Sequence, residues 1–211
     1  MWRKIIFAII ITTLFLSCHN EEPSEPPYGS NSVVVVTNRD YTPFVLEAIN
    51  KSENYIHILM YEMKYYAFDS VCGESQLLNA LIQVHTRGVE VKVILERSNY
   101  NSNLNEINES TYVYLVSEGI NVRFDSPSVT THAKLVVIDD KVAFLGSTNW
   151  TKSALDGNNE VNVEVTEEGI VRELELYFQN LWSQSSIYSE NIINNVSKDG
   201  KVSFLQVRNF H

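Results

Sequence analysis

The chain has 211 residues, of which 44% are apolar, so it favours one globular domain and excludes a disordered protein. Lys and Arg number 16 against 26 Asp and Glu, and the resulting charge of −10 is atypical of a protein that coats nucleic acid. A small local basic pocket stays compatible with this charge. The two cysteines, Cys18 and Cys72, are too few for a disulfide scaffold or a thiolate metal site.

The start of the chain predicts a secretory signal peptide. Arg3 and Lys4 precede an apolar run over residues 5–16, which is too short to cross a bilayer as a helix. Cys18 stands where the run stops, as in a bacterial lipobox, so we expect cleavage before it and a lipid on it. An ordinary signal peptide or a signal anchor is the alternative. Residues 18–32 are polar and rich in proline, which is typical of a tether.

Cleavage before Cys18 removes two positive charges and changes the formal charge from −10 to −12. The expected product is an exported lipoprotein that is anchored to a membrane of the bacterial cell envelope.

The first half of the folded region alternates between predicted strands and helices. We expect strands over 33–36, 55–63, 89–95 and 120–124, and helices over 42–52, 74–87 and before Gly119. Thr42 is the expected N-cap of the first helix, and Gly88 is the expected end of the second. Strands separated by helices of this length predict parallel crossovers and a sheet that is covered on both faces.

The alternation of strands and helices stops in the second half. Two apolar runs flank Asp139-Asp140-Lys141 and predict a hairpin. A strand over 161–165 and a helix over 169–182 follow, and the polar end of the chain contains a candidate edge strand over 201–207. The pattern predicts the α/β class, with a mixed, mostly parallel β-sheet and helices on both faces.

The predicted strand over 133–138 carries candidate catalytic residues. His132 and Lys134 are two residues apart at its start, and side chains at this spacing share one face of a strand. Asp139 has the opposite parity and lies at the far end, where we expect it to brace the hairpin.

Two further segments add polar groups. Gly146-Ser147-Thr148-Asn149 follows the next strand and offers the Ser147 hydroxyl and the Asn149 amide to an anion. Glu160 opens the strand after that, and a carboxylate there can hold the Nδ1 proton of a histidine.

These residues resemble the phospholipase D superfamily. The family pattern H-x-K-x4-D-x6-G-S-x-N is present with its spacing intact, and the family's downstream acid matches Glu160. The matching positions are His132, Lys134, Asp139, Gly146, Ser147 and Asn149. The resemblance covers roughly residues 33–182 and implies a phospholipase D-like α/β/α sandwich. Asp139 belongs to the family's catalytic set.

The resemblance implies a phosphodiesterase that uses no metal and no cofactor. Lys134 and Asn149, assisted by Ser147, bind the phosphate, and His132 attacks it to form a phosphohistidine. A second imidazole protonates the leaving group and then activates water. Since family members with one H-x-K form homodimers with a shared site, we expect His132 of the other subunit to be that acid and base. Each subunit also contributes Lys134, Asn149 and Glu160.

The motif leaves the substrate open. The anchor and the acidic charge favour phospholipid head groups. The alternative is an endonuclease that cleaves DNA or RNA, which needs several basic residues around the pocket. The candidates for such a groove are Lys141, Lys152, Arg97 and Arg123. A catalytically idle binding lipoprotein is the third hypothesis. The expected organisation is a signal peptide over 1–17, a tether over 18–32, a phospholipase D-like domain over 33–184 and a C-terminal extension over 185–211.

The remaining candidates have structural interpretations. We expect His57 to be structural or solvated and to have no partner cluster, and we expect Trp150 and Trp182 to pack in the core. Cys72 is the expected free thiol, with an intersubunit disulfide as the alternative. Tyr61 either lines the pocket or belongs to the core.

Overall fold

The structure is a computed structural model that describes residues 32–66 and 72–187. The predicted signal peptide, Cys18 and the candidate strand over 201–207 lie outside the described residues, as do nearly all of the tether and most of the C-terminal extension. Among the described segments, none of the helices combines the length and the apolar character that a membrane span requires.

Seven strands form a single sheet in the order β1-β7-β6-β5-β2-β3-β4. The strands are β1 Val33–Thr37, β2 Tyr55–Met60, β3 Glu90–Leu95, β4 Asn121–Phe124, β5 Lys134–Ile138, β6 Val142–Gly146 and β7 Val161–Val165. The helices are η1 Asn38–Asp40, α1 Tyr41–Lys51, α2 Gly73–Thr86, α3 Ser102–Ser117, α4 Lys152–Asp156 and α5 Glu168–Gln184.

The sheet is mixed, as predicted. Strands β2, β3 and β4 pair in parallel, and β5 pairs antiparallel with both β2 and β6. Strand β7 pairs antiparallel with β6 and β1. Five of the seven strands therefore run in one direction, as "mostly parallel" implies. Most neighbouring strands are nevertheless antiparallel to each other, so the prediction fails for the pairing. The reason is that the crossover after β1 skips three positions of the sheet, which the later strands fill.

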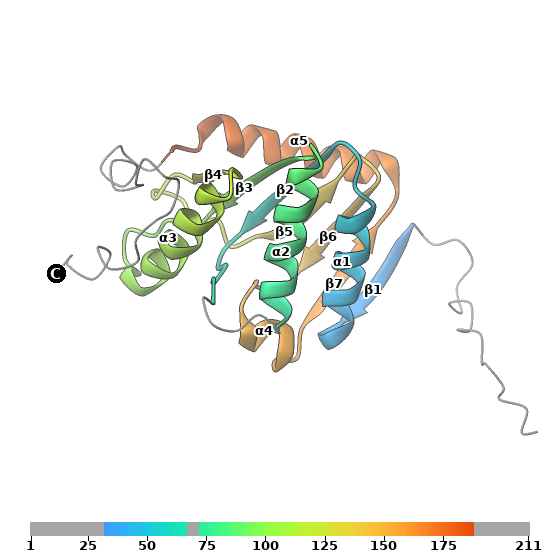
Figure 1. Ribbon diagram of the computed structural model, residues 1–211, viewed down its shortest axis with the longest axis horizontal. Coiled ribbons are helices and arrows are strands. Elements are labelled where there is room, and N and C mark those ends of the chain that lie inside the picture. Colours follow the sequence, from blue (N-terminus) through green and yellow to red (C-terminus); the bar gives the residue numbers. More distant parts are fainter. Residues whose placement is uncertain (1–31, 67–71, 188–211) are drawn as a thin grey trace, which may run out of the picture. The chain divides into compact units, whose positions relative to one another are not determined.

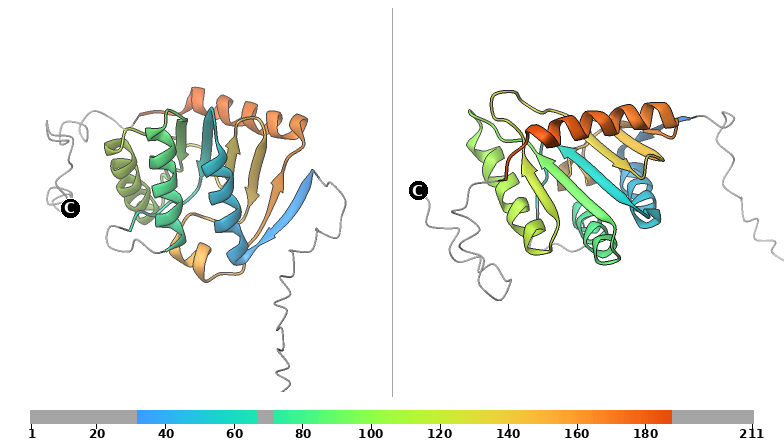
Figure 2. Two further views of the ribbon diagram at one scale, coloured as in Figure 1. Left: turned by 45° about the vertical axis from the view of Figure 1, so that its right-hand side comes forward. Right: turned by 90° about the horizontal axis from the view of Figure 1, so that it is seen from above.

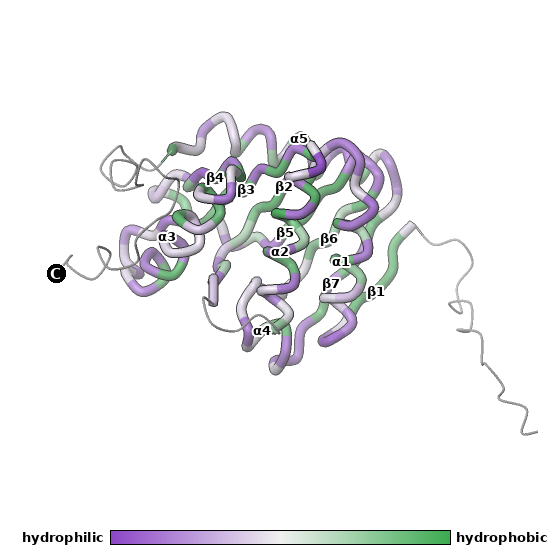
Figure 3. Tube along the Cα trace, viewed as in Figure 1, coloured by the Kyte–Doolittle hydropathy of each residue, from purple (hydrophilic) through white to green (hydrophobic). Residues whose placement is uncertain are grey.

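Helices cover both faces of the sheet (Figures 1 and 2). One face packs against α1, α2 and α3 and forms the larger core, while α5 packs on the other face and closes a second core. Figure 3 shows hydrophobic residues concentrated along the strands, with hydrophilic residues spread over the helices. The three layers confirm the α/β class and leave the ends of the strands open for polar residues.

Several local predictions are confirmed and others are wrong. Gly88 and Gly119 follow α2 and α3 with φ values of 98° and 85°, a conformation that glycine adopts without strain. Thr42 lies inside α1, whose N-cap is Asp40. The strand β1 is an edge strand with one exposed face, since Val35 is 65% exposed. The short helix α4 is absent from the sequence prediction.

Candidate active site

Apart from Asp139, the predicted site residues lie at one end of the strands, which we call the site edge of the sheet. Lys134, the first residue of β5, lies beside the end of β2. Leu135 pairs with Leu145, so Gly146 at the end of β6 is level with Lys134, and Gly146 in turn pairs with Asn162 of β7. This edge therefore joins the carboxyl ends of β2, β3, β4 and β6 to the starts of β5 and β7. Open α/β sheets bind their ligands at the carboxyl ends of their strands.

His132 and Lys134 are in contact at this edge. Lys134 Nζ lies 3.3 Å from His132 Nδ1 and 3.4 Å from His132 Nε2, and it donates a 2.8 Å hydrogen bond to His132 O. Lys134 is buried, whereas His132 is exposed. The ring of Tyr61, directly after β2, lies 4.5 Å from the imidazole and 4.8 Å from Lys134 Nζ. The shared face of His132 and Lys134 is confirmed, and Tyr61 lines the site.

The electrostatics of this pair suit nucleophilic attack on an anion. Burial and then the charge of Lys134 lower the pKa of His132, so its imidazole is neutral at neutral pH and keeps a lone pair. Burial also lowers the pKa of Lys134, while the carboxylates of Glu160 and Glu62 oppose that shift. The carboxylates thus favour the charged ammonium beside a neutral nucleophile.

Gly146 allows β6 and β7 to approach closely at the site. A Cβ at this position would lie 2.5 Å from Val161 O, so a larger residue would push the strands apart. Asn162 then fixes the next turn, because its Nδ2 donates 2.8 Å to Thr148 Oγ1 and its Oδ1 accepts 3.3 Å from Thr148 N. This contact holds the residues on either side of Thr148.

Ser147 and Glu160 hydrogen-bond to each other, with Ser147 Oγ as the donor. Asn158 Nδ2 donates 3.1 Å to the other carboxylate oxygen. Asn38, whose φ is 51°, accepts from Glu160 N at 2.9 Å and so anchors the backbone. Among the described residues no hydrogen bond joins Glu160 to His132, so the expected support of the His132 Nδ1 proton is not made within one subunit.

Asn149 leaves a polar atom unpaired at the same edge. Its Oδ1 is buried and has no hydrogen-bond partner within the described part of the chain. The neighbouring Trp150 is fully buried, as predicted, and its indole donates 3.2 Å to Tyr41 Oη. Trp150 thus fixes the backbone next to Asn149, and the buried Asn149 Oδ1 keeps its capacity to accept a hydrogen bond.

Asp139 lies at the opposite end of β5 and does not join this cluster. Its carboxylate accepts hydrogen bonds from Glu53 N at 2.7 Å and from Asn54 N and Tyr55 N at 2.8 Å each. These N–H groups lead into β2, so Asp139 ties the hairpin to the neighbouring strand. The predicted bracing role is confirmed. Within one subunit Asp139 contributes no group to the cluster around His132, because the length of β5 separates the two residues.

Sequence reasoning missed two buried acids at the site edge. Glu96 follows β3 and is 1% exposed, and Asp125 follows β4 and is 4% exposed. Glu96 Oε2 accepts 2.7 Å from Thr131 N, immediately before His132. Burial is the main cause that raises the pKa of Glu96 to about 7. The available signal was position, since each acid directly follows a predicted strand at the end of the sheet where ligands bind.

Three of the four basic residues considered for a nucleic-acid groove are engaged elsewhere. Lys141 forms a surface ion pair in the hairpin, at the opposite end of β5. Arg97 pairs with Glu109 at 2.6 Å. Arg123 donates 2.9 Å to Trp182 O and lies over the Trp182 ring, on the face covered by α5. The side chains of Lys141 and Arg97 are paired with carboxylates, and Arg123 lies on the face covered by α5. These three residues therefore do not form a basic groove around His132.

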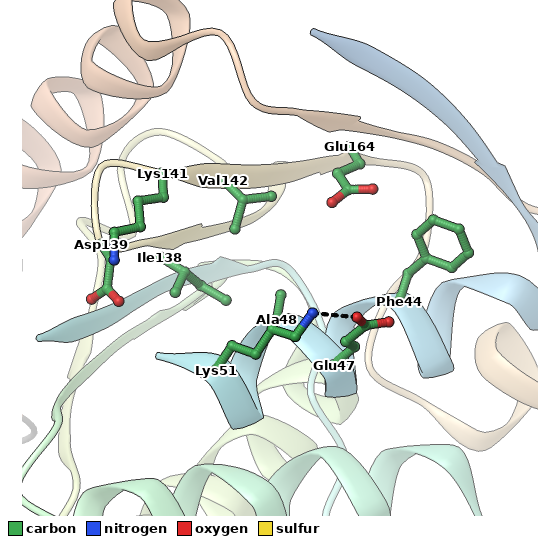
Figure 4. A pocket seen from close by; sticks show the side chains of 9 residues that line it. All are labelled: Phe44, Glu47, Ala48, Lys51, Ile138, Asp139, Lys141, Val142 and Glu164. Carbon is green, nitrogen blue, oxygen red and sulfur yellow. Dashed lines mark hydrogen bonds and ion pairs between the residues drawn. The ribbon is translucent and has the colours of Figure 1, made fainter. Parts of the chain in front are cut away.

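A hollow of about 410 Å³ opens at the hairpin end of the sheet, between α1 and strands β5 to β7 (Figure 4). The residues that line it are Phe44, Glu47, Ala48, Lys51, Ile138, Asp139, Lys141, Val142 and Glu164. Its one motif residue, Asp139, already accepts three backbone N–H groups. The hollow therefore carries no catalytic group, and the side-chain cluster at the other end of β5 defines the candidate site.

His57 is structural, but the expectation that it lacks a partner cluster is wrong. Its Nδ1 lies 2.9 Å from Glu175 of α5, its Nε2 lies 3.2 Å from Glu90, and its ring stacks on Phe178. These contacts join α5 to the sheet. Cys72 is buried and its thiol lies 3.4 Å from Glu74 Oε2, which disfavours the intersubunit disulfide.

Comparison with known sequences identifies the family. Residues 45–182 match the family described as "Cardiolipin synthase, PLD-like domain". The chain belongs to this phospholipase D-like family. Phospholipase D of Rickettsia prowazekii is 33% identical over 146 residues, which are 69% of this chain and 62% of that protein. Mitochondrial cardiolipin hydrolase of Canis lupus familiaris is 28% identical over 185 residues, which are 86% and 67% of the two chains. The chain spans about three fifths of the length of the rickettsial relatives.

Solved structures show the same phospholipase D-like fold. Nuc from Salmonella typhimurium, a phospholipase D family member, has a TM-score of 0.62 and 24% identity, covering 75% of this chain and 98% of Nuc. NucT from Helicobacter pylori has a TM-score of 0.58 and 22% identity, covering 74% of this chain and 99% of NucT. The family and the fold implied by the motif are thus confirmed.

Proposed function

We propose that this protein is a phosphodiesterase that hydrolyses phospholipid head groups through a phosphohistidine on His132. The observation that carries the proposal is the contact between the neutral His132 imidazole and the buried Lys134 ammonium, with 3.3 Å between Nδ1 and Nζ. A phosphodiester repels nucleophiles until its charge is balanced, and Lys134 supplies that balance beside the attacking group. The Asn149 amide and the Ser147 hydroxyl add hydrogen-bonding groups at the same edge of the sheet.

The reaction proceeds in two displacements. A His132 nitrogen forms a bond to phosphorus while the bond from phosphorus to the head-group oxygen breaks, and a second imidazolium gives its proton to that oxygen. Water then attacks phosphorus, the second imidazole takes the proton of the water, and the P–N bond breaks. The products are the head-group alcohol and phosphatidic acid, and His132 is regenerated.

A second copy of the chain supplies the second imidazole. Within the described residues the other histidines are used elsewhere, since His57 bonds to α5 and His85 lies 3.3 Å from Val89 O. The unpaired Asn149 Oδ1, and the separation of Glu160 from His132 within one subunit, support a site that is completed across a dimer axis. An isologous interface brings two copies of each site residue together.

Phospholipid is favoured over nucleic acid by charge and by the rim of the site. Most of the candidate groove cations are engaged elsewhere, as described above. Tyr100 is 77% exposed and Val129 is 71% exposed on the loops after β3 and β4, and Tyr100 Oη lies 3.0 Å from Thr130 Oγ1, two residues before His132. Exposed aromatic and aliphatic side chains partition into the lipid–water interface. Cleavage of DNA or RNA is the alternative.

The same proposal includes a membrane location. The apolar run over 5–16 and the tether over 18–32 support export and a lipid on Cys18, which would hold the site near a bilayer of the cell envelope. Growth of expressing cells with a radiolabelled fatty acid tests this. We expect label on the wild-type protein and none on Cys18→Ala, and equal labelling of both proteins would contradict the anchor.

A substrate panel tests the activity. Full-length protein in detergent micelles is assayed in EDTA with phosphatidylcholine, cardiolipin, single-stranded DNA and RNA, beside His132→Ala. We expect release of a lipid head group by the wild type alone. Cleavage restricted to nucleic acid supports the endonuclease instead. A folded dimer that hydrolyses none of the four substrates contradicts the proposal and favours an idle binding lipoprotein.

A further inference from the structure

A buried acid, Glu96, hydrogen-bonds to the backbone directly before His132, and a second buried acid, Asp125, lies beside it. Leu95 and Phe124 pair across β3 and β4, so the buried acids Glu96 and Asp125, which are the next residues, lie side by side. Asp125 Oδ2 is buried and has no hydrogen-bond partner among the described residues. Two carboxylates have no proton to share, so a proton on one acid is needed to pair this oxygen.

The hydrogen bonds described around the two carboxyl groups come from neutral backbone donors, so a bound proton is what lowers the negative charge of the pair. Arg97 N donates 3.0 Å to Asp125 Oδ1, whereas the guanidinium pairs with Glu109 of α3. Asn108 of α3 donates 2.9 Å to Glu96 O, which uses the backbone and not the carboxyl group. Of the other titratable groups, Tyr61 after β2 interacts with Glu96 and also with Tyr100 and Glu62. His132 and Lys134 at the start of β5 contact the ring of Tyr61.

We propose that Glu96 and Asp125 hold one proton between them and that this pair positions His132 through the hydrogen bond from Thr131 N to Glu96. That bond is 2.7 Å long, and Thr131 is 8% exposed and precedes His132 in the chain. The role in catalysis rests on the proposed function, and the proton-sharing pair does not. Loss of the proton leaves two negative charges in a buried site, where their repulsion separates the ends of β3 and β4 and releases Thr131.

The direction of the pH dependence follows from burial. Burial raises the pKa of both acids, so their shared proton is lost as pH rises. We expect kcat to fall on the alkaline side with little change in KM, because phosphate binding depends on Lys134 and Asn149. Glu96→Gln reproduces the protonated pair, since its amide group can donate to Asp125 and accept from Thr131 N. This variant therefore removes the alkaline loss.

Nuclear magnetic resonance measures the pair without turnover. In carbon-labelled full-length protein we expect one carboxyl group that titrates above about pH 6, well beyond the ordinary range of an acid. The Tyr61 ring lies 4.5 Å from the imidazole, so its ring current makes the His132 signal sensitive to position. In the wild type that signal shows a second inflection together with the carboxyl group. Glu96→Gln abolishes both effects, and Glu109→Gln, the control on the acid that pairs with Arg97, keeps them.

Kinetics of the same variants separate positioning from simple stability. Glu96→Ala should lower kcat about tenfold with little change in KM, and Glu96→Gln should restore it. Titration of every carboxyl group below about pH 5 overturns the proton-sharing pair. A His132 signal that is the same in wild type and Glu96→Gln overturns the positioning role, even in an active enzyme. If both magnetic resonance effects appear but no phosphodiester is hydrolysed, the pair stands and the proposed function fails.

Discussion

The two ends of β5 use one short motif in different ways. At the start of the strand, His132 and Lys134 lie beside buried polar atoms that the described chain leaves unpaired, among them Asn149 Oδ1 and Asp125 Oδ2. At the far end, Asp139 accepts hydrogen bonds from three backbone N–H groups that lead into β2. The start of β5, where polar atoms lack hydrogen-bond partners, is suited to binding and chemistry. The far end, where Asp139 has its partners, holds β5 and β2 together.

The largest effect is expected at the start of β5. His132→Ala should lower kcat at least about a thousandfold, because it removes the nucleophile, and should change the free energy of unfolding by less than about 1 kcal/mol because the side chain is exposed. Steady-state assays and thermal unfolding of the same preparation measure both quantities. His85→Ala is the control, since this histidine contacts Val89 O after the end of α2 and is not among the predicted site residues. Retained activity in His132→Ala would contradict the assignment.

Mixed dimers test whether the site is shared. Differently tagged wild-type and His132→Ala chains are co-expressed, and the heterodimers are isolated. We expect them to lack normal turnover, because one subunit lacks the nucleophile and the other lacks its acid and base. Full activity per wild-type chain would mean that each subunit carries a complete site.

The far end of β5 should respond in stability and not in kcat. Asp139→Ala leaves three N–H groups without their acceptor, so the free energy of unfolding should fall by about 2–4 kcal/mol. Urea unfolding measures this, and kcat is compared at a temperature where both proteins are folded. Asp140→Ala, which loses the neighbouring contact with Tyr55 Oη, is the control and should cost less. A loss of kcat at unchanged stability would return Asp139 to the chemistry.

A smaller effect is expected in the pH dependence of stability. Burial raises the folded-state pKa of Glu96 to about 7, above its unfolded value, so the folded chain holds a proton that the unfolded chain has released. The stability that this bound proton adds to the fold is complete below the unfolded pKa of Glu96 and is lost as pH rises through about 7. Glu96→Gln should flatten the fall of Tm between about pH 5 and pH 8. An unchanged slope would show that Glu96 ionises normally.

The smallest effect is expected at the hairpin surface. Lys141 and Glu53 have side chains that are 62% and 68% exposed, and exposed ion pairs contribute little. Lys141→Ala should change the free energy of unfolding by less than about 1 kcal/mol and leave kcat unaltered. A marked loss of nucleic-acid cleavage in this variant would show that the hairpin end of β5 also takes part in function, which would contradict the proposed difference between the two ends of the strand.

Local patterns in the sequence predict more than the pairing of distant segments. The spacing of His132, Lys134 and Asn149 identifies the family and the site edge, and the opposite parity of Asp139 predicts its separation from His132. The antiparallel position of β1 depends on strands that come much later in the chain, so alternation alone does not reveal it. Glu96 and Asp125 become neighbours only when β3 and β4 pair. The sequence around each acid therefore gives no sign that the two share a proton.

The covalent intermediate tests the central claim most directly. Wild-type protein and His132→Ala are mixed with the phospholipid that the panel identifies, stopped within the first turnover under alkaline conditions that preserve phosphohistidine, and analysed by peptide mass spectrometry. We predict a phosphatidyl group on His132 in the wild type and no adduct in His132→Ala. Turnover by the wild type with an adduct on another residue, or with none at any quench time, would contradict the mechanism.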